Sequence, residues 1–506
     1  MRLDSRLGLV LSGVAGLALP LSFAPFDLFP VAPLSVAMLF AIWTRVPARR
    51  AFLCGWIYGL AANGFGVFWI HESFQFNHIA IGWALLLTGL LVMFLALYPG
   101  MVGYCVRRFG KAGQRSQLLL LMPAAWVLAE WIRGWLFTGF TWLQLGYSQI
   151  DSPLRGLLPV GGIYVTSWAV AASAALLVLI VREHGNRRWS WLAALIVMWT
   201  ASGLLGFVKW TAPAGDAIKV ALVQGNMPQD KKWLAEMRRP TLERYLALTR
   251  AHWDADLIVW PESALPGLRD SFDEYIARLA DEARANNAHV VFGVPVLDRD
   301  TQRLYNSVFV VGGREMVYHK RHLVPFGEYL PLDALIRPVS EALGLPVADF
   351  NLGPDKQEWL EAAGHRLGVS VCYEIAFGNE ILEALPEAAV LVTVSNDAWF
   401  GTSIGPYQHM QIARARALET GRYLLRATNT GITAIVGPDG VVEGRVPQFE
   451  VQVLEGEILP MQGMTPYARI GDSAVIAVLA ILAILVLVVF GTIVIGRQRS
   501  ARDDSG

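Results

Sequence analysis

Long apolar segments with few charges fill the first 208 residues, and they constrain the fold of this 506-residue chain more than any other feature. Residues 1–208 contain 14 Lys+Arg and 6 Asp+Glu, about one charge in ten residues. Residues 209–506 contain the other 28 and 36, about one charge in five. A membrane span needs about 20 mostly apolar residues. The first part therefore predicts membrane-spanning helices, and the second predicts a mostly water-soluble domain.

Eight segments are apolar enough to be predicted as spans. They are 7–25, 30–44, 52–70, 79–105, 117–135, 161–181, 189–208 and 473–496. The last is the most uniformly apolar, and the second is short and flanked by proline. The segment that follows MRLDSR has no convincing cleavage site, so we predict that it is a retained span.

Positive charges predict how these spans are oriented, because Lys and Arg concentrate in cytoplasmic loops. Basic residues occupy every second loop and the C-terminal tail. The loop at 45–50 holds Arg45, Arg49 and Arg50, whereas the next one, 71–78, holds none. The prediction is four parts: a seven-span domain over 1–208, an extracytoplasmic domain over 209–472, a helix over 473–496 and a cytoplasmic tail over 497–506. Both termini would be cytoplasmic, and the outer domain would be periplasmic.

The outer domain alternates short apolar strands with amphipathic helices, a pattern that predicts an α/β sheet covered by helices. Strands are predicted at 219–226, 256–262, 289–296, 307–312, 315–320, 366–374, 388–395, 423–429, 432–437 and 441–446. Helices are predicted at 233–252, 271–286 and 406–420, and a Pro- and Gly-rich loop at about 321–355. In such sheets the chemistry usually lies at the carboxyl ends of the strands.

Three polar residues lie at predicted strand ends: Glu262, Lys320 and Cys372. A carboxylate, an ammonium and a thiol are the groups that thiol-based acyl transfer needs. The thiol attacks a carbonyl as thiolate, a nearby base takes its proton, and fixed donors stabilise the oxyanion. Glu262 would be the base, and Lys320 with a backbone N–H after the nucleophile would be the donors. The alternative is an inert Cys372 with solvated Glu and Lys side chains.

The segments around these residues resemble the Glu-Lys-Cys motifs of the nitrilase superfamily. They are WPESALP (260–266), YHKRHLVPFGEYLP (318–331) and VCYE (371–374), followed by SNDAWFG (395–401). Together with eight spans they resemble the apolipoprotein N-acyltransferases, the membrane-embedded members of that superfamily. The resemblance covers nearly the whole chain. It implies that the outer domain is an αββα sandwich.

The resemblance also implies roles for individual residues. Glu262 matches the general base, Lys320 the lysine that stabilises the tetrahedral intermediate, and Cys372 the nucleophile. Four further positions match residues that the family uses: Glu328 supports the lysine and the acid/base work, Tyr373 and Glu374 follow the nucleophile, and Trp233 lies near the entrance of the site.

The activity that the resemblance implies is the last step of bacterial lipoprotein maturation at the inner membrane. A phospholipid, by resemblance phosphatidylethanolamine, would acylate Cys372. The thioester would then pass the acyl chain to the α-amine of a diacylglyceryl-cysteine at the N-terminus of an apolipoprotein. No metal or cofactor is expected, because the sequence has no Walker, HExxH or paired CxxC motif. A net charge of zero gives no sign of nucleic-acid binding.

Two other functions use the same sequence features. One is a membrane-tethered amidase with water as acceptor, although a single anchor would suffice for tethering. The other is a transporter or scaffold with an inactive outer domain, although polar groups in mid-span, typical of transporters, are nearly absent. At the span ends, Glu130 with Arg133 and His71 with Glu72 have two interpretations, either interfacial pairs and helix caps or groups that bind a lipid headgroup.

Overall fold

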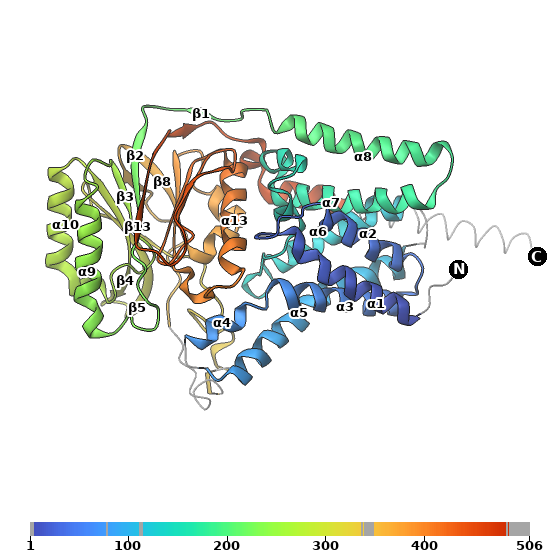
Figure 1. Ribbon diagram of the computed structural model, residues 1–506, viewed down its shortest axis with the longest axis horizontal. Coiled ribbons are helices and arrows are strands. Elements are labelled where there is room, and N and C mark those ends of the chain that lie inside the picture. The colour runs from blue at the N-terminus through green and yellow to red at the C-terminus, as the bar shows by residue number, and fades with distance from the viewer. Residues whose placement is uncertain are drawn as a thin grey trace, which may run out of the picture. The chain divides into compact units, whose positions relative to one another are not determined.

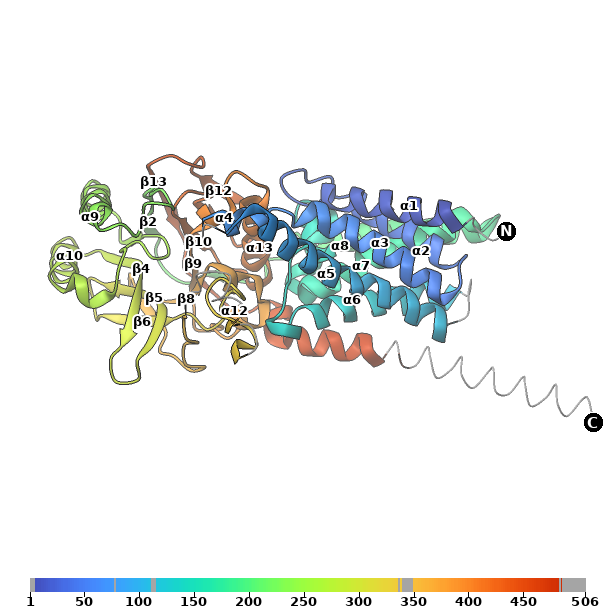
Figure 2. The same cartoon turned by 90° about the horizontal axis from the view of Figure 1, so that it is seen from below.

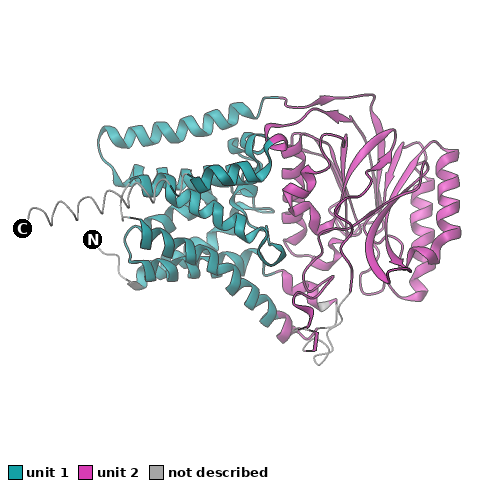
Figure 3. Ribbon diagram, turned by 180° about the vertical axis from the view of Figure 1, so that it is seen from behind, with its two compact units in different colours: residues 1–68, 85–208, 470–506 teal, residues 69–84, 209–469 magenta. Residues whose placement is uncertain are grey.

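The computed structural model describes residues 5–76, 79–110, 115–334, 337–338, 349–481 and 484. The chain folds into two compact units, coloured separately in Figure 3. The helical unit comprises residues 1–68, 85–208 and 470–506. The sheet unit comprises residues 69–84 and 209–469, so it includes a short piece that lies between the third and fourth predicted spans.

A helix covers each of the seven predicted segments in the first 208 residues. These helices are α1 (Ser5–Ala18), α2 (Val31–Trp43), α3 (Ala48–Gly66), α5 (Ile81–Phe109), α6 (Met122–Arg133, after a π turn at Gln117–Leu121), α7 (Leu158–Arg182) and α8 (Asn186–Leu205). A further short helix, α4 (Ile70–Gln75), belongs to the sheet unit. The helices of the helical unit are visible in Figure 1.

Two helices of the described chain are long and apolar enough to cross a membrane by themselves. They cover Ile81–Phe109, with a mean hydropathy of 2.2, and Pro153–Arg182, with 2.1. Arg6–Ser22 and Val31–Trp43 are apolar but shorter. The eight predicted spans are therefore not confirmed as a set. The last of them, 473–496, lies mostly outside the described residues, although 466–481 is helical.

The sheet unit contains two six-stranded mixed sheets. The first has the order β13-β2-β3-β4-β5-β6, and the second has the order β12-β11-β10-β9-β8-β7. In each sheet three parallel strands lie side by side, β2-β3-β4 in the first and β8-β9-β10 in the second, and antiparallel strands flank them. Because these strands are parallel, their carboxyl ends lie at the same edge of each sheet.

A strand lies at each predicted position, whereas β7 and β13 were not predicted. In the first sheet the strands are β2 (Ile218–Gln224), β3 (Leu257–Val259), β4 (His289–Asp298), β5 (Arg303–Val311), β6 (Met316–His319) and β13 (Gln452–Ile458). In the second they are β7 (Leu360–Ala362), β8 (His365–Val371), β9 (Val390–Ser395), β10 (Leu424–Thr428), β11 (Ala434–Val436) and β12 (Val442–Arg445). A small pair, β1 (Ala212–Pro213) and β14 (Met461–Gln462), lies apart from both.

The two sheets face each other across one apolar core, to which both contribute. Val220, Val259 and Val291 come from the first sheet, and Val371 and Val392 come from the second; all are at most 2% exposed. Branched side chains such as these pack well between two pleated surfaces.

Helices cover the outer faces of both sheets, as Figures 1 and 2 show. α9 (Ala235–Arg250) and α10 (Asp273–Ala285) cover the first sheet, and α13 (Gly405–Thr420) covers the second, near the short α12 (Gly378–Leu382). α10 packs through Tyr275, Ile276 and Leu279, whose spacing places them on one face of the helix. The predicted αββα sandwich is confirmed.

Candidate active site

The three predicted residues of the site each follow a strand of the sandwich. Glu262 comes three residues after the end of β3, Lys320 directly follows β6, and Cys372 directly follows β8. β3 and β6 belong to the first sheet and β8 to the second, so the two sheets supply the three groups together. Electrostatic interactions of Cys372 with both Glu262 and Lys320 place the three side chains in one cluster.

Glu262 is buried, and hydrogen bonds fix both of its carboxylate oxygens. Oε1 accepts from the side-chain amide of Asn306 at 2.7 Å, and Oε2 accepts from the backbone N–H of Asn396 at 2.9 Å. Nζ of Lys320 lies 3.8 Å from Oε1. Burial raises the pKa of Glu262, Lys320 opposes this shift, and the nearby Glu328 adds to it. The carboxylate is therefore a stronger base than an exposed one.

Lys320 is 1% exposed and is paired with a second carboxylate. Its Nζ lies 2.9 Å from Oε1 and 2.8 Å from Oε2 of Glu328. Glu328 is itself held by the amide of Asn306 at 3.0 Å and by the backbone N–H of Val324 at 2.8 Å. Burial alone would lower the pKa of Lys320, but Glu328 and Glu262 outweigh burial and raise it. Lys320 therefore remains an ammonium ion throughout the neutral pH range.

Cys372 occupies a strained turn. Its φ is 53°, in the left-handed region that residues with a Cβ rarely adopt, and a 3₁₀ turn (Cys372–Ala376) begins there. Strand β8 thus ends abruptly, and the side chain is only partly buried. Burial and the negative charge of Glu262 raise the pKa of the thiol. The resting thiol is therefore protonated at neutral pH, and it needs a base to become a nucleophile.

A buried network of polar side chains contacts the backbone of Cys372. Nε2 of His409, on α13, lies 3.1 Å from the carbonyl oxygen of Cys372, and Nδ1 lies 3.0 Å from Asp397. Burial alone would raise the pKa of Asp397, but Arg426 and His409 outweigh burial and lower this pKa to about 2. Asp397 therefore stays ionised, and it anchors His409 of α13, which contacts the turn at Cys372.

Glu374 connects the turn at Cys372 to the segment after Lys320. Its Oε2 accepts from the backbone N–H of Val371 at 2.7 Å, and its Oε1 accepts from the backbone N–H of Arg321 at 2.6 Å and from the Tyr318 hydroxyl at 3.0 Å. Burial raises the pKa of Glu374. Glu374 therefore connects the end of β8 to the segment that follows β6.

The two aromatic residues among the predicted site positions differ in their surroundings. Tyr373 is buried against the rings of His322 and Phe377, at centroid distances of 5.6 and 5.1 Å. Trp233 is 51% exposed, and its ring centroid lies 5.8 Å from Nζ of Lys232. No interaction between Trp233 and the Glu262–Lys320–Cys372 cluster is recorded in the described chain. Its proximity to the entrance stays a prediction.

Sequence reasoning missed three residues that support Glu262. Asn306 and Asn396 donate to its carboxylate, and Lys232, which is 1% exposed, donates from Nζ to its backbone carbonyl at 3.3 Å. Burial lowers the pKa of Lys232 to about 8. Asn306 interrupts an apolar strand, which is a signal that the sequence offered. Nothing in the pair Lys231–Lys232 indicates which of the two is buried.

The arrangement can carry out acyl transfer through a covalent thioester. It combines a thiol at a strained strand end, a carboxylate of raised pKa and a permanently charged ammonium, all fixed by hydrogen bonds from rigid elements. Within the described residues, no group of three or more His, Cys, Asp or Glu side chains is placed to hold a metal ion.

Comparison with known proteins decides the family. Residues 219–467 match the model of the carbon–nitrogen hydrolase family, and residues 15–176 match the apolipoprotein N-acyltransferase N-terminal domain. An apolipoprotein N-acyltransferase of Methylococcus capsulatus is 45% identical over 467 residues, which are 92% of each chain. One of Photobacterium profundum is 40% identical over 476 residues, 92% of this chain and 91% of the relative.

The chain belongs to the apolipoprotein N-acyltransferase family. It is therefore an N-acyltransferase of the carbon–nitrogen hydrolase superfamily, and most of that family's N-terminal domain lies in the helical unit. Among solved structures, Nit3 of Saccharomyces cerevisiae, a member of the nitrilase superfamily, superimposes with a TM-score of 0.37. It is 22% identical and covers 50% of this chain and 93% of its own.

The raised pKa of Glu262 predicts how the reactivity of this N-acyltransferase depends on pH. Because the base acts only as a carboxylate, alkylation of Cys372 by iodoacetamide should slow as the pH falls through the raised pKa. The pH at the midpoint of this fall in rate should lie above the ordinary glutamate pKa of about 4.3. Glu262→Gln should remove this pH dependence and slow alkylation on the order of 100-fold. Peptide mass spectrometry separates Cys372 from Cys54 and Cys105. A profile unchanged by Glu262→Gln would contradict this assignment.

The second prediction for this N-acyltransferase concerns Gly293 of β4, whose backbone lies very close to the backbone of Glu262. A Cβ at Gly293 would lie 2.4 Å from the backbone nitrogen of Ser263 and 2.7 Å from Cα of Glu262. Gly293→Ala should displace Glu262 and lower acyl-transfer activity on the order of 100-fold. Gly82→Ala is the matched control, since a Cβ there meets nothing within 4 Å. Equal activities of the two variants would show that the close approach is not needed.

Proposed function

We propose that this protein transfers a fatty acyl chain from a phospholipid to the α-amino group of the N-terminal diacylglyceryl-cysteine of apolipoproteins, in two steps through a thioester at Cys372. The observation that carries the proposal is the cluster of the buried Glu262 and Lys320 with the partly buried Glu328 beside the strained Cys372, in a chain of this family. The donor that we propose is phosphatidylethanolamine, and the reaction is the last step of lipoprotein maturation.

In the first step, Cys372 attacks the ester carbonyl of the phospholipid. Glu262 takes the S–H proton, and the new S–C bond turns the carbonyl oxygen into an oxyanion, which the ammonium of Lys320 stabilises. The C–O ester bond then breaks. The departing oxygen takes the proton from Glu262, so lysophospholipid leaves and the acyl chain stays on the sulfur. The charges of Glu262 and Lys320 are the same before and after this step.

In the second step, the α-amine of the lipoprotein attacks the thioester. The pKa of an α-amine is about 7.7–8.0, so an appreciable fraction is neutral at pH 7. Glu262 accepts the proton that the amine loses, and Lys320 again stabilises the oxyanion. The C–S bond breaks, Cys372 regains its proton from Glu262, and the acyl chain leaves as an amide.

The remaining predicted residues serve this reaction indirectly. Glu328 fixes the ammonium of Lys320 through both of its oxygens and keeps it charged. Glu374 and Tyr373 hold the turn of the nucleophile, the first through backbone N–H groups and the second through ring packing. Trp233 is exposed on the same segment as Lys232, and we propose that it contacts the lipid substrates.

We further propose that the chain is a multi-pass protein of the bacterial inner membrane, with eight spans, both termini in the cytoplasm and the catalytic domain in the periplasm. Helices over the seven predicted N-terminal segments and basic residues in alternate loops support this topology. Two of the helices are long and apolar enough to span alone. Lipid substrates fit such a location, because extracting an acyl chain into water costs about 0.8 kcal/mol per CH₂.

The amidase alternative, with water as acceptor, is not favoured. The same Glu262, Lys320 and Cys372 would serve it. However, the relatives that match over nine-tenths of the chain are N-acyltransferases, and the matched N-terminal helical domain has no role in hydrolysis of a soluble amide.

A transfer assay separates the two reactions. Purified protein is incubated with phosphatidylethanolamine that carries a labelled acyl chain and with a synthetic diacylated lipopeptide. We expect the label on the lipopeptide amine and little free fatty acid. Rapid release of labelled fatty acid, at the same rate with and without lipopeptide, would contradict transfer and favour the hydrolase.

The matched control is an N-acetylated lipopeptide, which keeps both lipid chains but has no free α-amine. We expect no label on it. Lys320→Met should slow transfer by at least about 100-fold, since the oxyanion loses its charged donor. Transfer to the blocked peptide at the normal rate would show that the α-amine is not the acceptor.

A further inference from the structure

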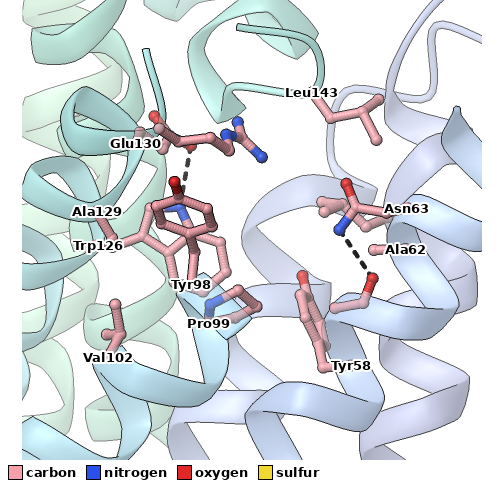
Figure 4. Close-up of a pocket in the computed structure, with 13 residues that line it drawn as sticks. Tyr58, Ala62, Asn63, Tyr98, Pro99, Val102, Trp126, Ala129, Glu130 and Leu143 are labelled. Atoms are coloured by element: carbon pink, nitrogen blue, oxygen red, sulfur yellow. Dashed lines mark hydrogen bonds between the residues drawn. The ribbon is translucent and has the colours of Figure 1, made fainter. Parts of the chain in front are cut away.

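A mostly apolar pocket with a few polar groups lies within the helical unit, among residues that the reaction at Cys372 does not use. α3, α5 and α6 form its walls, with Leu19 and Leu143 completing it. It encloses about 470 Å³ of space, part of which is open to the surroundings. The cavity volume that water-sized molecules can reach is about 40 Å³, about three times the roughly 10–15 Å³ that one water molecule needs. Figure 4 shows the side chains that line it.

Arg133, at the end of α6, brings a positive charge to the pocket, which Glu130 balances in part, and it has unpartnered donors there. It is 8% exposed, and neither Nε nor Nη2 has a hydrogen-bond partner among the described residues. A buried guanidinium normally has its planar fork of donors paired with a carboxylate or a phosphate. The donors of Arg133 are therefore available to an acceptor that enters from outside the protein.

Glu130, one helical turn earlier, brings the opposite charge and has only one oxygen engaged. Oε1 accepts from the backbone N–H of Leu145 at 2.9 Å and from Nε1 of Trp126 at 3.0 Å. Figure 4 shows the bond to Trp126. Oε2 has no partner among the described residues, and Glu130 is 5% exposed. The carboxylate is thus held rigidly, with one oxygen left for a donor.

Two neutral groups add one further donor and one further acceptor. The hydroxyl of Tyr98 has no partner in the described chain, nor has Oδ1 of Asn63. The amide nitrogen of Asn63 is engaged with the carbonyl of Gly59 at 2.8 Å, which fixes the orientation of the side chain (Figure 4). Buried polar groups are nearly always hydrogen-bonded, so four unpartnered groups around one pocket indicate a ligand with both acceptors and donors.

The wall of the pocket that α5 forms indicates where this ligand comes from. Tyr98, Pro99 and Val102 line the pocket, whereas their neighbours Leu97 and Met101 are 41% and 51% exposed. α5 is also one of the two helices that are apolar enough to cross a membrane by themselves. Exposed apolar side chains beside buried charged groups fit a molecule that has acyl chains and a polar headgroup.

We propose that this pocket binds the headgroup of a zwitterionic phospholipid. The phosphate accepts hydrogen bonds from Arg133 and Tyr98, and the primary ammonium donates to Glu130 and Asn63. The inference rests on the proposed function in one respect, since the bound lipid belongs to the class of the acyl donor. It adds a place where the protein selects that lipid by its headgroup.

The test measures equilibrium binding of short-chain lipids to the full-length protein in detergent. The Cys372→Ala background prevents consumption of the donor. The probes are dihexanoyl phosphatidylethanolamine, dihexanoyl phosphatidylglycerol and inorganic phosphate. We expect phosphatidylethanolamine to bind on the order of tenfold more tightly than phosphatidylglycerol, because only the former carries an ammonium for Glu130. Inorganic phosphate should bind far more weakly than either lipid.

Variants of Arg133 and Glu130 test the role of each charged group in lipid binding. Arg133→Gln should weaken binding of both lipids on the order of tenfold or more, and Arg133→Lys should restore part of it. Glu130→Gln keeps the acceptor for Leu145 and should abolish the preference for phosphatidylethanolamine over phosphatidylglycerol. Arg49→Gln is the matched control, because it removes an exposed arginine of the same unit, and it should bind as the parent does.

Three outcomes would overturn the proposal. Unchanged lipid binding by Arg133→Gln in folded protein would show that the pocket holds only water. Phosphate that binds as tightly as the lipids would make it a site for a free anion. A preference for phosphatidylethanolamine that survives Glu130→Gln would remove the ammonium contact. Because the reactive thiol is absent from these experiments, failure of acyl transfer itself would be seen separately, in the transfer assay with Cys372 present.

Discussion

The ammonium of Lys320, held between the carboxylates of Glu262 and Glu328, is the interaction on which the rest of the site depends. Glu262 and Lys320 are buried and Glu328 is partly buried, and burying a charge is costly unless it is paired and hydrogen-bonded. Asn306 bridges the two carboxylates, and backbone N–H groups satisfy their remaining oxygens. The result is a rigid arrangement in which one carboxylate keeps the lysine charged while the other stays available as a base.

The strand ends of the sandwich set up this arrangement, and the sequence predicted a large part of it. Alternating strands and helices indicated the α/β class, and the predicted positions of Glu262, Lys320 and Cys372 after apolar strands agree with the structure. The edge strand β13 was missed, because its exposed face breaks the apolar run with Glu455 and Glu457. It pairs antiparallel with β2, more than 200 residues earlier, and such long-range pairing has no local signal.

The supporting residues were harder to predict for the same physical reason. Asp397, His409 and Arg426 form a buried network beside the backbone of Cys372, yet each lies on a different element. Whether a charged side chain is solvated or belongs to a site depends on its burial. The sequence alone does not indicate that Lys232, and not Lys231, is buried. In the helical unit, likewise, the sequence left two interpretations of Glu130 and Arg133 open, an interfacial pair or a headgroup site, and the structure leaves polar atoms of both unpartnered around one pocket.

The measurement that tests the account most directly is the mass of the intact protein after incubation with phosphatidylethanolamine and no amine acceptor. The account predicts a gain of one fatty acyl group, mapped to Cys372, removed by hydroxylamine and absent from Cys372→Ser. Addition of diacylated lipopeptide should then return the protein to its original mass. Absence of any acyl adduct on folded wild-type protein, or an adduct that persists in Cys372→Ser, would contradict the thioester mechanism.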